Sequence, residues 1–120
     1  MKLLTAHDRA QLLANGQTRR QAERDNPEVA IDFLPVVKLF TPDAGCTWLL
    51  TELDPDDGDT AFGLCDLGLG FPELGYVSLA ELATVRGQLK LPVERDLHFT
   101  ATRTLSAYAQ DARAAGGISA

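Results

Sequence analysis

Turn-forming residues separate three short apolar runs in the middle of the chain. The runs are PVVKLF (35–40), CTWLLTEL (46–53) and TAFGLCDL (60–67), and the turns between them are TPDAG (41–45) and DPDDGD (54–59). The runs are rich in β-branched and aromatic residues, which favour strands. Parallel neighbours need a crossover of a dozen or more residues, so turns this short predict an antiparallel meander.

The rest of the chain adds strands and three helices. GYVSL predicts a fourth strand at 75–78, and LPVERDLHF ends in a fifth at 94–99. Because the helices lie at the N-terminus, after strand four and at the C-terminus, the predicted class is α+β with an antiparallel sheet of about four or five strands. In the second strand, Leu49, Thr51 and Leu53 are expected to share one face.

The first helix has recognisable ends. Thr5 is placed to cap it, with Asp8 in its first turn. Asn15-Gly16 is expected to end it in a left-handed conformation. The polar residues 17–26 are expected to add one or two helical turns in solvent.

The later helices follow the same rules. Ser78 and Glu81 form an S-x-x-E capping box, and the helix that they begin is expected to stop at Gly87. The last helix, 104–115, is expected to stop at Gly116.

A length of 120 residues favours one domain. We expect a single domain, 1–120, with a helical segment at 1–26, antiparallel strands within 34–79 and a C-terminal helix at 104–115.

Composition favours a cytoplasmic protein without a cofactor. No apolar run reaches the 18 residues that a membrane helix requires, and the start MKLLTAHDRAQLL lacks the apolar core of a signal peptide. Two cysteines, Cys46 and Cys65, are too few for a disulfide scaffold and are predicted to be buried, reduced thiols. His7 and His98 lie far from them in the sequence, so neither a metal site nor a cofactor is expected.

Three glycines, Gly68, Gly70 and Gly75, interrupt the stretch CDLGLGFPELGYVSL at 65–79. A dinucleotide fingerprint needs G-x-G-x-x-G before a helix, but Glu73 holds the place of the third glycine and would repel a pyrophosphate. A Walker A loop needs a lysine, which this stretch lacks. The glycines are therefore predicted to let the chain bend between strands three and four.

The acidic turn at 54–59 raises the question of a calcium site. With Gly58 at position 6 of an EF-hand loop, Leu53 falls at position 1 and Leu64 at position 12, where carboxylates are needed. The motif fails. A weak cation site stays open as an alternative, and the simpler interpretation is a solvated hairpin loop whose acids discourage edge-to-edge pairing.

Acidic residues are concentrated in the middle of the chain. Residues 27–82 hold eleven acids and one lysine, whereas 1–26 and 83–120 each hold five basic and three acidic residues. Such a field repels phosphate and attracts basic protein surfaces. The middle segment is therefore expected to bind a protein rather than nucleic acid, although acidic loops also serve solubility alone.

The sequence offers few candidate catalytic motifs. The sequence has no G-x-S-x-G elbow. Cys46 or Cys65 with His98 would make a nucleophile pair, and Asp66 with Glu73 an acid–base pair. Both cysteines, however, lie in predicted strands among apolar residues, where thiols are usually inert. The chain is therefore expected not to be an enzyme, with a thiol or carboxylate site as the alternative.

Long motifs run through the chain: VVKLFTPDAGCTWLLTELDPDD, AFGLCDLGLGFPELGYVSLAEL and LPVERDLHF. They resemble a family of small bacterial proteins of unknown function, typically carried on plasmids, integrative elements and phages. The resemblance extends from MKLLT to SAYAQDAR. The family label implies no reaction and no catalytic residues. Some relatives look like anti-CRISPR proteins that inhibit type II CRISPR nucleases.

The resemblance implies a binding protein that occupies the positively charged channel of a nuclease. Carboxylates would then replace phosphates against Lys and Arg. The acids expected to do so are Asp54, Asp56, Asp57, Asp59, Asp66 and Glu73. If Phe71, Leu74 and Tyr76 face solvent together, the glycine-rich bend adds a docking patch.

The other interpretation is an accessory factor of a mobile element that contacts nucleic acid. It would use the basic ends of the chain. The residues concerned are Arg19, Arg20, Arg24, Arg95 and Arg103.

Overall fold

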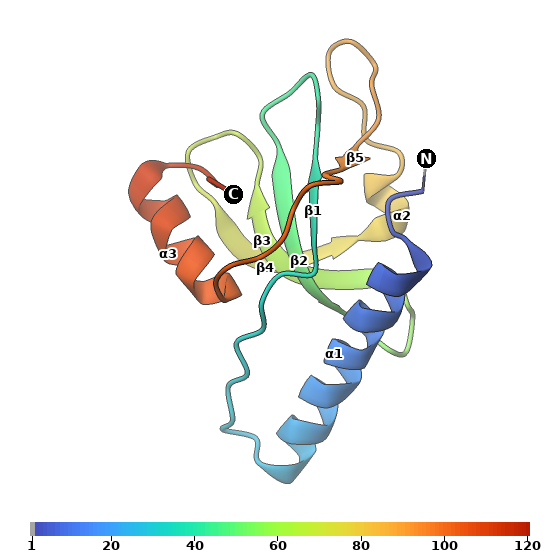
Figure 1. The fold of residues 1–120 in the computed structure, drawn as a ribbon, viewed down its shortest axis with the longest axis vertical. Helices are drawn as coiled ribbons and strands as arrows, with labels where there is room; N and C mark the ends of the chain where they lie inside the picture. The colour runs from blue at the N-terminus through green and yellow to red at the C-terminus, as the bar shows by residue number, and fades with distance from the viewer. Residues whose placement is uncertain (1) are drawn as a thin grey trace.

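Residues 2–120 are described by the structure, a computed structural model, and form an α+β fold (Figure 1). The predicted class is confirmed. The elements are α1 (Ala6–Asp25), β1 (Val37–Phe40), β2 (Thr47–Leu53), β3 (Thr60–Asp66), β4 (Glu73–Ser78), α2 (Leu79–Leu82), β5 (Glu94–Arg95) and α3 (Leu105–Ala115).

The strands form one sheet in the order β4-β3-β2-β1-β5, with all neighbours antiparallel. The predicted meander is confirmed for β1 to β4. The fifth strand is much shorter than the predicted 94–99, because the chain turns after Asp96. The Asp96 carboxylate accepts the N–H of His98 at 2.9 Å, which holds that turn. The two edges of the sheet therefore differ, since β5 has two residues and β4 has six.

The expectation that Gly16 ends the first helix is wrong, because α1 is continuous over Ala6–Asp25. A Cβ on Gly16 would lie 1.9 Å from the carbonyl oxygen of Leu53, so the glycine lets α1 cross the end of β2 at close range. The side chain of Asn15 donates to the Thr51 carbonyl at 2.8 Å and fixes the crossing. Thr5 caps the helix as predicted, accepting the N–H of Asp8 at 2.9 Å.

A β-bulge reverses the predicted orientation of Leu53. The pairing of β2 with β3 shifts between Leu50 and Glu52, so Thr51 is an extra residue in the ladder. Leu53 consequently packs with Leu50 in one core cluster, while Leu49 lies in the other. Glu52 turns to the face that carries Leu49.

Each face of the sheet has its own core. The α1 face buries Leu12 of α1 and Leu79 of α2 against Trp48. The α3 face packs Tyr108 and other side chains of α3 against Leu49 and its neighbours. Full burial of one such side chain contributes about 1.5–3 kcal/mol, so these two layers hold the sheet.

The second helix is shorter than predicted. Ser78 caps it by accepting the N–H of Glu81 at 3.2 Å, as expected, but α2 ends at Leu82 rather than at Gly87. The hydroxyl of Thr84 donates to the Glu81 carbonyl at 2.7 Å and competes with a further helical turn. The last helix agrees with its prediction, with Gly116 in the left-handed conformation at φ 79°.

The glycine-rich bend is confirmed in part. Gly68 and Gly70 have positive φ, at 77° and 87°, and turn the chain between β3 and β4. Gly75 was expected to bend with them, but it lies inside β4 and pairs with Gly63.

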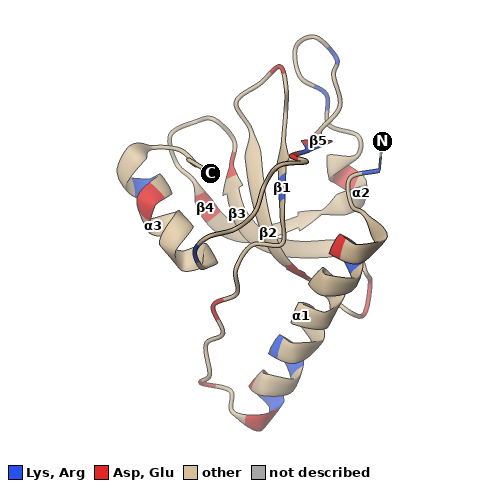
Figure 2. Ribbon diagram, viewed as in Figure 1, with Lys and Arg blue, Asp and Glu red and all other residues tan. Residues whose placement is uncertain are grey.

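Charged residues occur on helices, loops and strands (Figure 2). The strands carry six of them: Lys38, Glu52, Asp66, Glu73, Glu94 and Arg95. The end of α1 extends beyond the sheet (Figure 1). Within residues 2–120, no helix has both the length and the apolar character needed to cross a membrane.

Candidate functional site

Asp57 organises the turn between β2 and β3. One carboxylate oxygen accepts the N–H groups of Asp59 and Thr60 at 2.8 and 2.9 Å, and the other accepts the Thr60 hydroxyl at 2.6 Å. The Thr60 hydroxyl, followed by the backbone donors, lowers the pKa of Asp57 to about 2. Asp57 is thus a structural part of its turn.

Two arginines of α1 lie against this acidic turn. Arg20 bridges Asp54 and Asp56, at 3.0 and 2.7 Å. The hydrogen bond that Arg20 donates to Asp56 raises the pKa of Arg20. Arg9 donates to the Gly58 carbonyl at 2.6 Å. Segments that are separate in the sequence therefore offset each other in space, and the acidic turn is less negative than its own residues indicate.

The other predicted acids have different surroundings. Asp59 accepts the Ser78 hydroxyl at 2.6 Å and the Ala80 N–H at 2.8 Å, so it joins the turn to the start of α2. Glu73 is exposed on β4. Asp56, although paired, keeps 78% of its side chain exposed.

Asp66 does not belong to the acidic surface. It is buried, and its carboxylate accepts the N–H groups of Gly68 at 2.8 Å and Ile118 at 2.9 Å. Asp66 therefore anchors both the glycine-rich bend and the end of the chain. The alternation of side chains along the strand correctly predicted that Asp66 shares a face with Leu64. Its burial was not predicted, because the C-terminal segment that covers it is distant in the sequence.

The predicted docking patch faces solvent. Phe71 is 79% exposed, Tyr76 74% and Leu74 38%. Leu67 and Leu69 are also exposed, although the predicted patch does not include them. The sequence LGLG indicates this larger patch, because a bend of alternating leucine and glycine cannot bury every leucine side chain. We call Leu67, Leu69, Phe71, Leu74 and Tyr76 the β4 patch.

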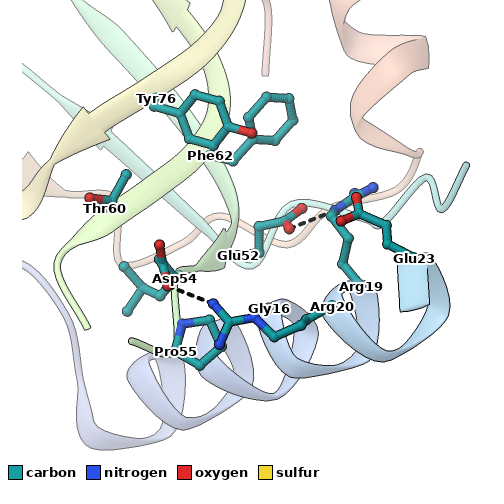
Figure 3. A pocket seen from close by; sticks show the side chains of 11 residues that line it. Gly16, Arg19, Arg20, Glu23, Glu52, Asp54, Pro55, Thr60, Phe62 and Tyr76 are labelled. Carbon is teal, nitrogen blue, oxygen red and sulfur yellow. Dashed lines mark hydrogen bonds and ion pairs between the residues drawn. The ribbon is translucent and has the colours of Figure 1, made fainter. Parts of the chain in front are cut away.

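A cavity of about 190 Å³ adjoins the patch and lies between α1, the end of β2 and strands β3 and β4 (Figure 3). Tyr76 lies beside Phe62 in its wall, with ring centroids 5.0 Å apart. Asp54 lines the same cavity, so the acidic turn meets the β4 patch at Tyr76.

The floor of this cavity contains a partly buried ion pair that the sequence predictions missed. Arg19 Nε lies 2.6 Å from Glu52, which is 7% exposed. Arg19 also donates to the Ile31 carbonyl at 2.8 Å and stacks over Phe33. The signal was a carboxylate inside the apolar run TWLLTEL, which requires a partner when it is buried. With these partners the pair joins α1, β2 and the segment before β1.

Most of the arginines predicted to contact nucleic acid already bind groups of the protein itself. Arg19 and Arg20 bind carboxylates, Arg103 binds Asp111, and Arg95 donates to backbone carbonyls near the N-terminus. These contacts reduce the number of donors that could meet phosphates.

The family model described as "Protein of unknown function (DUF2958)" matches residues 3–119. The chain belongs to this family. No curated protein and no solved structure matches the chain. The match confirms the resemblance to a family of unknown function over nearly the whole length of the chain.

The surroundings of Cys65 in this DUF2958 protein disfavour its thiolate. Both cysteines are free, and both are half-buried rather than buried as predicted. Burial raises the pKa of Cys65 to about 11, which keeps the thiol protonated at neutral pH. Within residues 2–120 there is no group of three or more His, Cys, Asp and Glu side chains arranged to hold a metal.

Proposed function

We propose that this DUF2958 protein is a small acidic binding protein of the cytoplasm, not an enzyme, that docks on a protein partner through the β4 patch. The observation that carries the proposal is the exposure of Phe71 and Tyr76 within one continuous stretch of chain. Large contiguous apolar patches are rare on soluble monomers, and those that occur often mark interaction sites. Aromatic residues are also enriched at the centres of protein interfaces.

The acidic turn supplies long-range attraction in this proposal. It meets the patch at Tyr76, since Asp54 and Tyr76 line one cavity. Exposed carboxylates such as Asp56 and Glu73 would steer a basic surface toward the patch and discourage acidic partners.

The candidate partner is a type II CRISPR nuclease. It comes from the resemblance to mobile-element proteins with anti-CRISPR-like relatives. Such nucleases hold nucleic acids in positively charged channels, and an acidic domain with an apolar anchor has the chemistry to occupy part of one. Asp54, Asp56 and Glu73 would face the channel, whereas Asp66 is buried and has no part.

The experiment measures DNA cleavage by a type II CRISPR nuclease in the presence of this protein. The double variant Phe71→Ser, Tyr76→Ser should lose inhibition, because it removes both aromatic anchors and leaves the two cores intact. Leu89→Ser is the matched control, since Leu89 is as exposed as Tyr76 at 74% but lies in the loop after α2.

Two results would contradict the proposal separately. Cleavage at an unchanged rate with the wild-type protein would refute the nuclease as partner. Equal inhibition by the wild type and the double variant would refute the patch. Asp56→Lys tests the charge, because Asp56 is exposed, whereas reversal of Asp57 would also disrupt the turn.

A further inference from the structure

Within residues 2–120, the outer edge of β4 has no strand beside it. β4 pairs with β3 on one side and stands last in the order β4-β3-β2-β1-β5 (Figure 1). An edge strand presents unpaired N–H and C=O groups that can accept another strand. All six residues of β4 are exposed or half-buried, in contrast with the buried run of β2.

The register identifies which backbone groups face outward. Leu79 donates its N–H to the Asp59 carbonyl at 3.0 Å, which makes these two residues a hydrogen-bonded pair. Hydrogen-bonded and non-hydrogen-bonded pairs alternate along an antiparallel ladder. Leu74 and Tyr76 fall on the non-hydrogen-bonded positions, so their N–H and C=O groups point away from β3. Neither residue has a backbone partner elsewhere in residues 2–120.

The two faces of this edge differ in chemistry. Leu74 and Tyr76 place apolar side chains on the α3 face. On the α1 face, Glu73 is exposed at the start of β4, and Glu81 lies at a mainly apolar hollow that Val77 of β4 also lines. Between them, a Cβ on Gly75 would meet nothing within 4 Å, so a long side chain from a neighbouring strand has room there. Glycine inside a strand often marks such an approach by another backbone.

We propose that β4 binds an extended segment of a partner protein in which apolar residues alternate with lysine or arginine. The segment adds a sixth strand by hydrogen bonding to Leu74 and Tyr76. Its apolar side chains cover those two residues, and its basic side chains lie along Gly75 toward Glu73 and Glu81. The inference rests on the proposed docking role of the β4 patch and specifies how the partner is recognised.

Charge decides between this segment and a second copy of the chain. Each chain carries a formal net charge of −6, and pairing two β4 edges would bring two acidic faces together. Like charges disfavour that arrangement, whereas a basic strand gains attraction from the same residues.

The probe is a synthetic seven-residue peptide of alternating lysine and valine, capped at both ends. Binding to the full chain is measured by titration, and amide hydrogen exchange is read at Leu74 and Tyr76. The peptide is expected to slow exchange at these two amides. A peptide with the same composition but with its lysines grouped together should bind at least about tenfold more weakly, because its charges and apolar groups cannot separate onto two faces.

Leu74→Pro removes one outward N–H without removing a donor from the β3–β4 ladder, and proline is tolerated at edges on that side. It should weaken peptide binding by about tenfold or more. Leu74→Val is the control, because it keeps both the N–H and the apolar side chain. Glu73→Lys should weaken the lysine–valine peptide and strengthen a glutamate–valine peptide, a reversal that holds even if the proline variant folds poorly.

Three results would overturn the inference: equal affinity for the alternating and grouped peptides, unchanged affinity in Leu74→Pro, or protection of Leu74 and Tyr76 by dimerisation without peptide. These outcomes are separable from failure of the proposed function. Loss of nuclease inhibition in the Phe71→Ser, Tyr76→Ser variant supports the patch whatever the peptide does. Peptide binding without nuclease inhibition keeps the strand-addition site and removes the nuclease.

Discussion

Strands β2 and β4 belong to one sheet and have similar side chains but opposite surroundings. Each contains an aromatic residue, a leucine and a glutamate. In β2, Trp48 is 3% exposed and Glu52 is enclosed with Arg19; in β4, Tyr76 is 74% exposed and Glu73 faces solvent. The difference comes from position, since β2 has a neighbour on each side and helices over both faces. The same residue types thus stabilise the fold in β2 and are available for binding in β4.

The aromatic residues give the largest expected contrast. Trp48→Ala should lower the free energy of unfolding by about 3–5 kcal/mol, because it leaves a cavity in the core of the α1 face. Tyr76→Ala should cost about 1 kcal/mol, mainly its contact with Phe62. Urea denaturation of both variants measures the difference. Equal losses of unfolding free energy would mean that Tyr76 stabilises the fold as much as Trp48 does.

Gly16, which packs against the end of β2, and Gly75 of β4 extend the comparison of the two strands to the backbone. Gly16→Ala should destabilise by about 3 kcal/mol, because its Cβ would collide with the Leu53 carbonyl and force α1 away from β2. Gly75→Ala meets open space and should change stability by about 0.5 kcal/mol or less. Thermal unfolding distinguishes the two. A large loss in Gly75→Ala would show that the edge of β4 is more constrained than its surroundings indicate.

The carboxylates give a smaller contrast. Arg19→Ala leaves Glu52 without its partner and should cost about 2 kcal/mol, since the pair retains some contact with solvent. Glu73→Ala should change stability by about 0.5 kcal/mol or less. The two variants are compared in the same urea titration at neutral pH. A similar cost in both would contradict the assignment of Glu52 to structure and Glu73 to the surface.

Acid should affect the turn that leaves β2. The pKa of Asp57 falls from an ordinary value of 3.8 to about 2 in the folded chain. A carboxylate whose pKa is lower in the folded than in the unfolded chain stabilises the fold at any pH above its unfolded-state pKa. This stabilisation is lost as the pH falls toward the folded-state pKa. Stability measured from pH 5 to pH 2 should therefore fall less steeply in Asp57→Asn than in the wild type. Parallel curves would show that Asp57 does not contribute.

Local signals were predicted well from the sequence. Thr5, Ser78 and Gly116 act at helix ends as expected, because each makes a contact within a few residues. Short turns likewise predicted the meander. The role of Gly16 was predicted wrongly because it depends on Leu53 of β2, which lies 37 residues later. In the sequence, a glycine that ends a helix cannot be told from one that lets a helix cross a strand at close range.

The candidate site was predicted less completely, for the same physical reason. The apolar residues Phe71, Leu74 and Tyr76 were identified, but sequence does not reveal which strand is an edge. Arg20 was assigned to a solvated segment, whereas tertiary structure places it between two carboxylates of the acidic turn. Contacts across more than 30 residues decide which charges remain free.

The continuous α1 is held against the sheet along most of its length but not at its end. Leu12, Gly16 and the pair of Arg19 with Glu52 fix most of α1 against the sheet. Gln21, Glu23 and Arg24 are exposed near its end, which extends beyond the sheet. A helix held at one end opens and closes more readily at the other. Asp25, the last residue of α1, is therefore a suitable position for a fluorescent label, because it belongs neither to the two cores nor to the lining of the cavity beside the β4 patch.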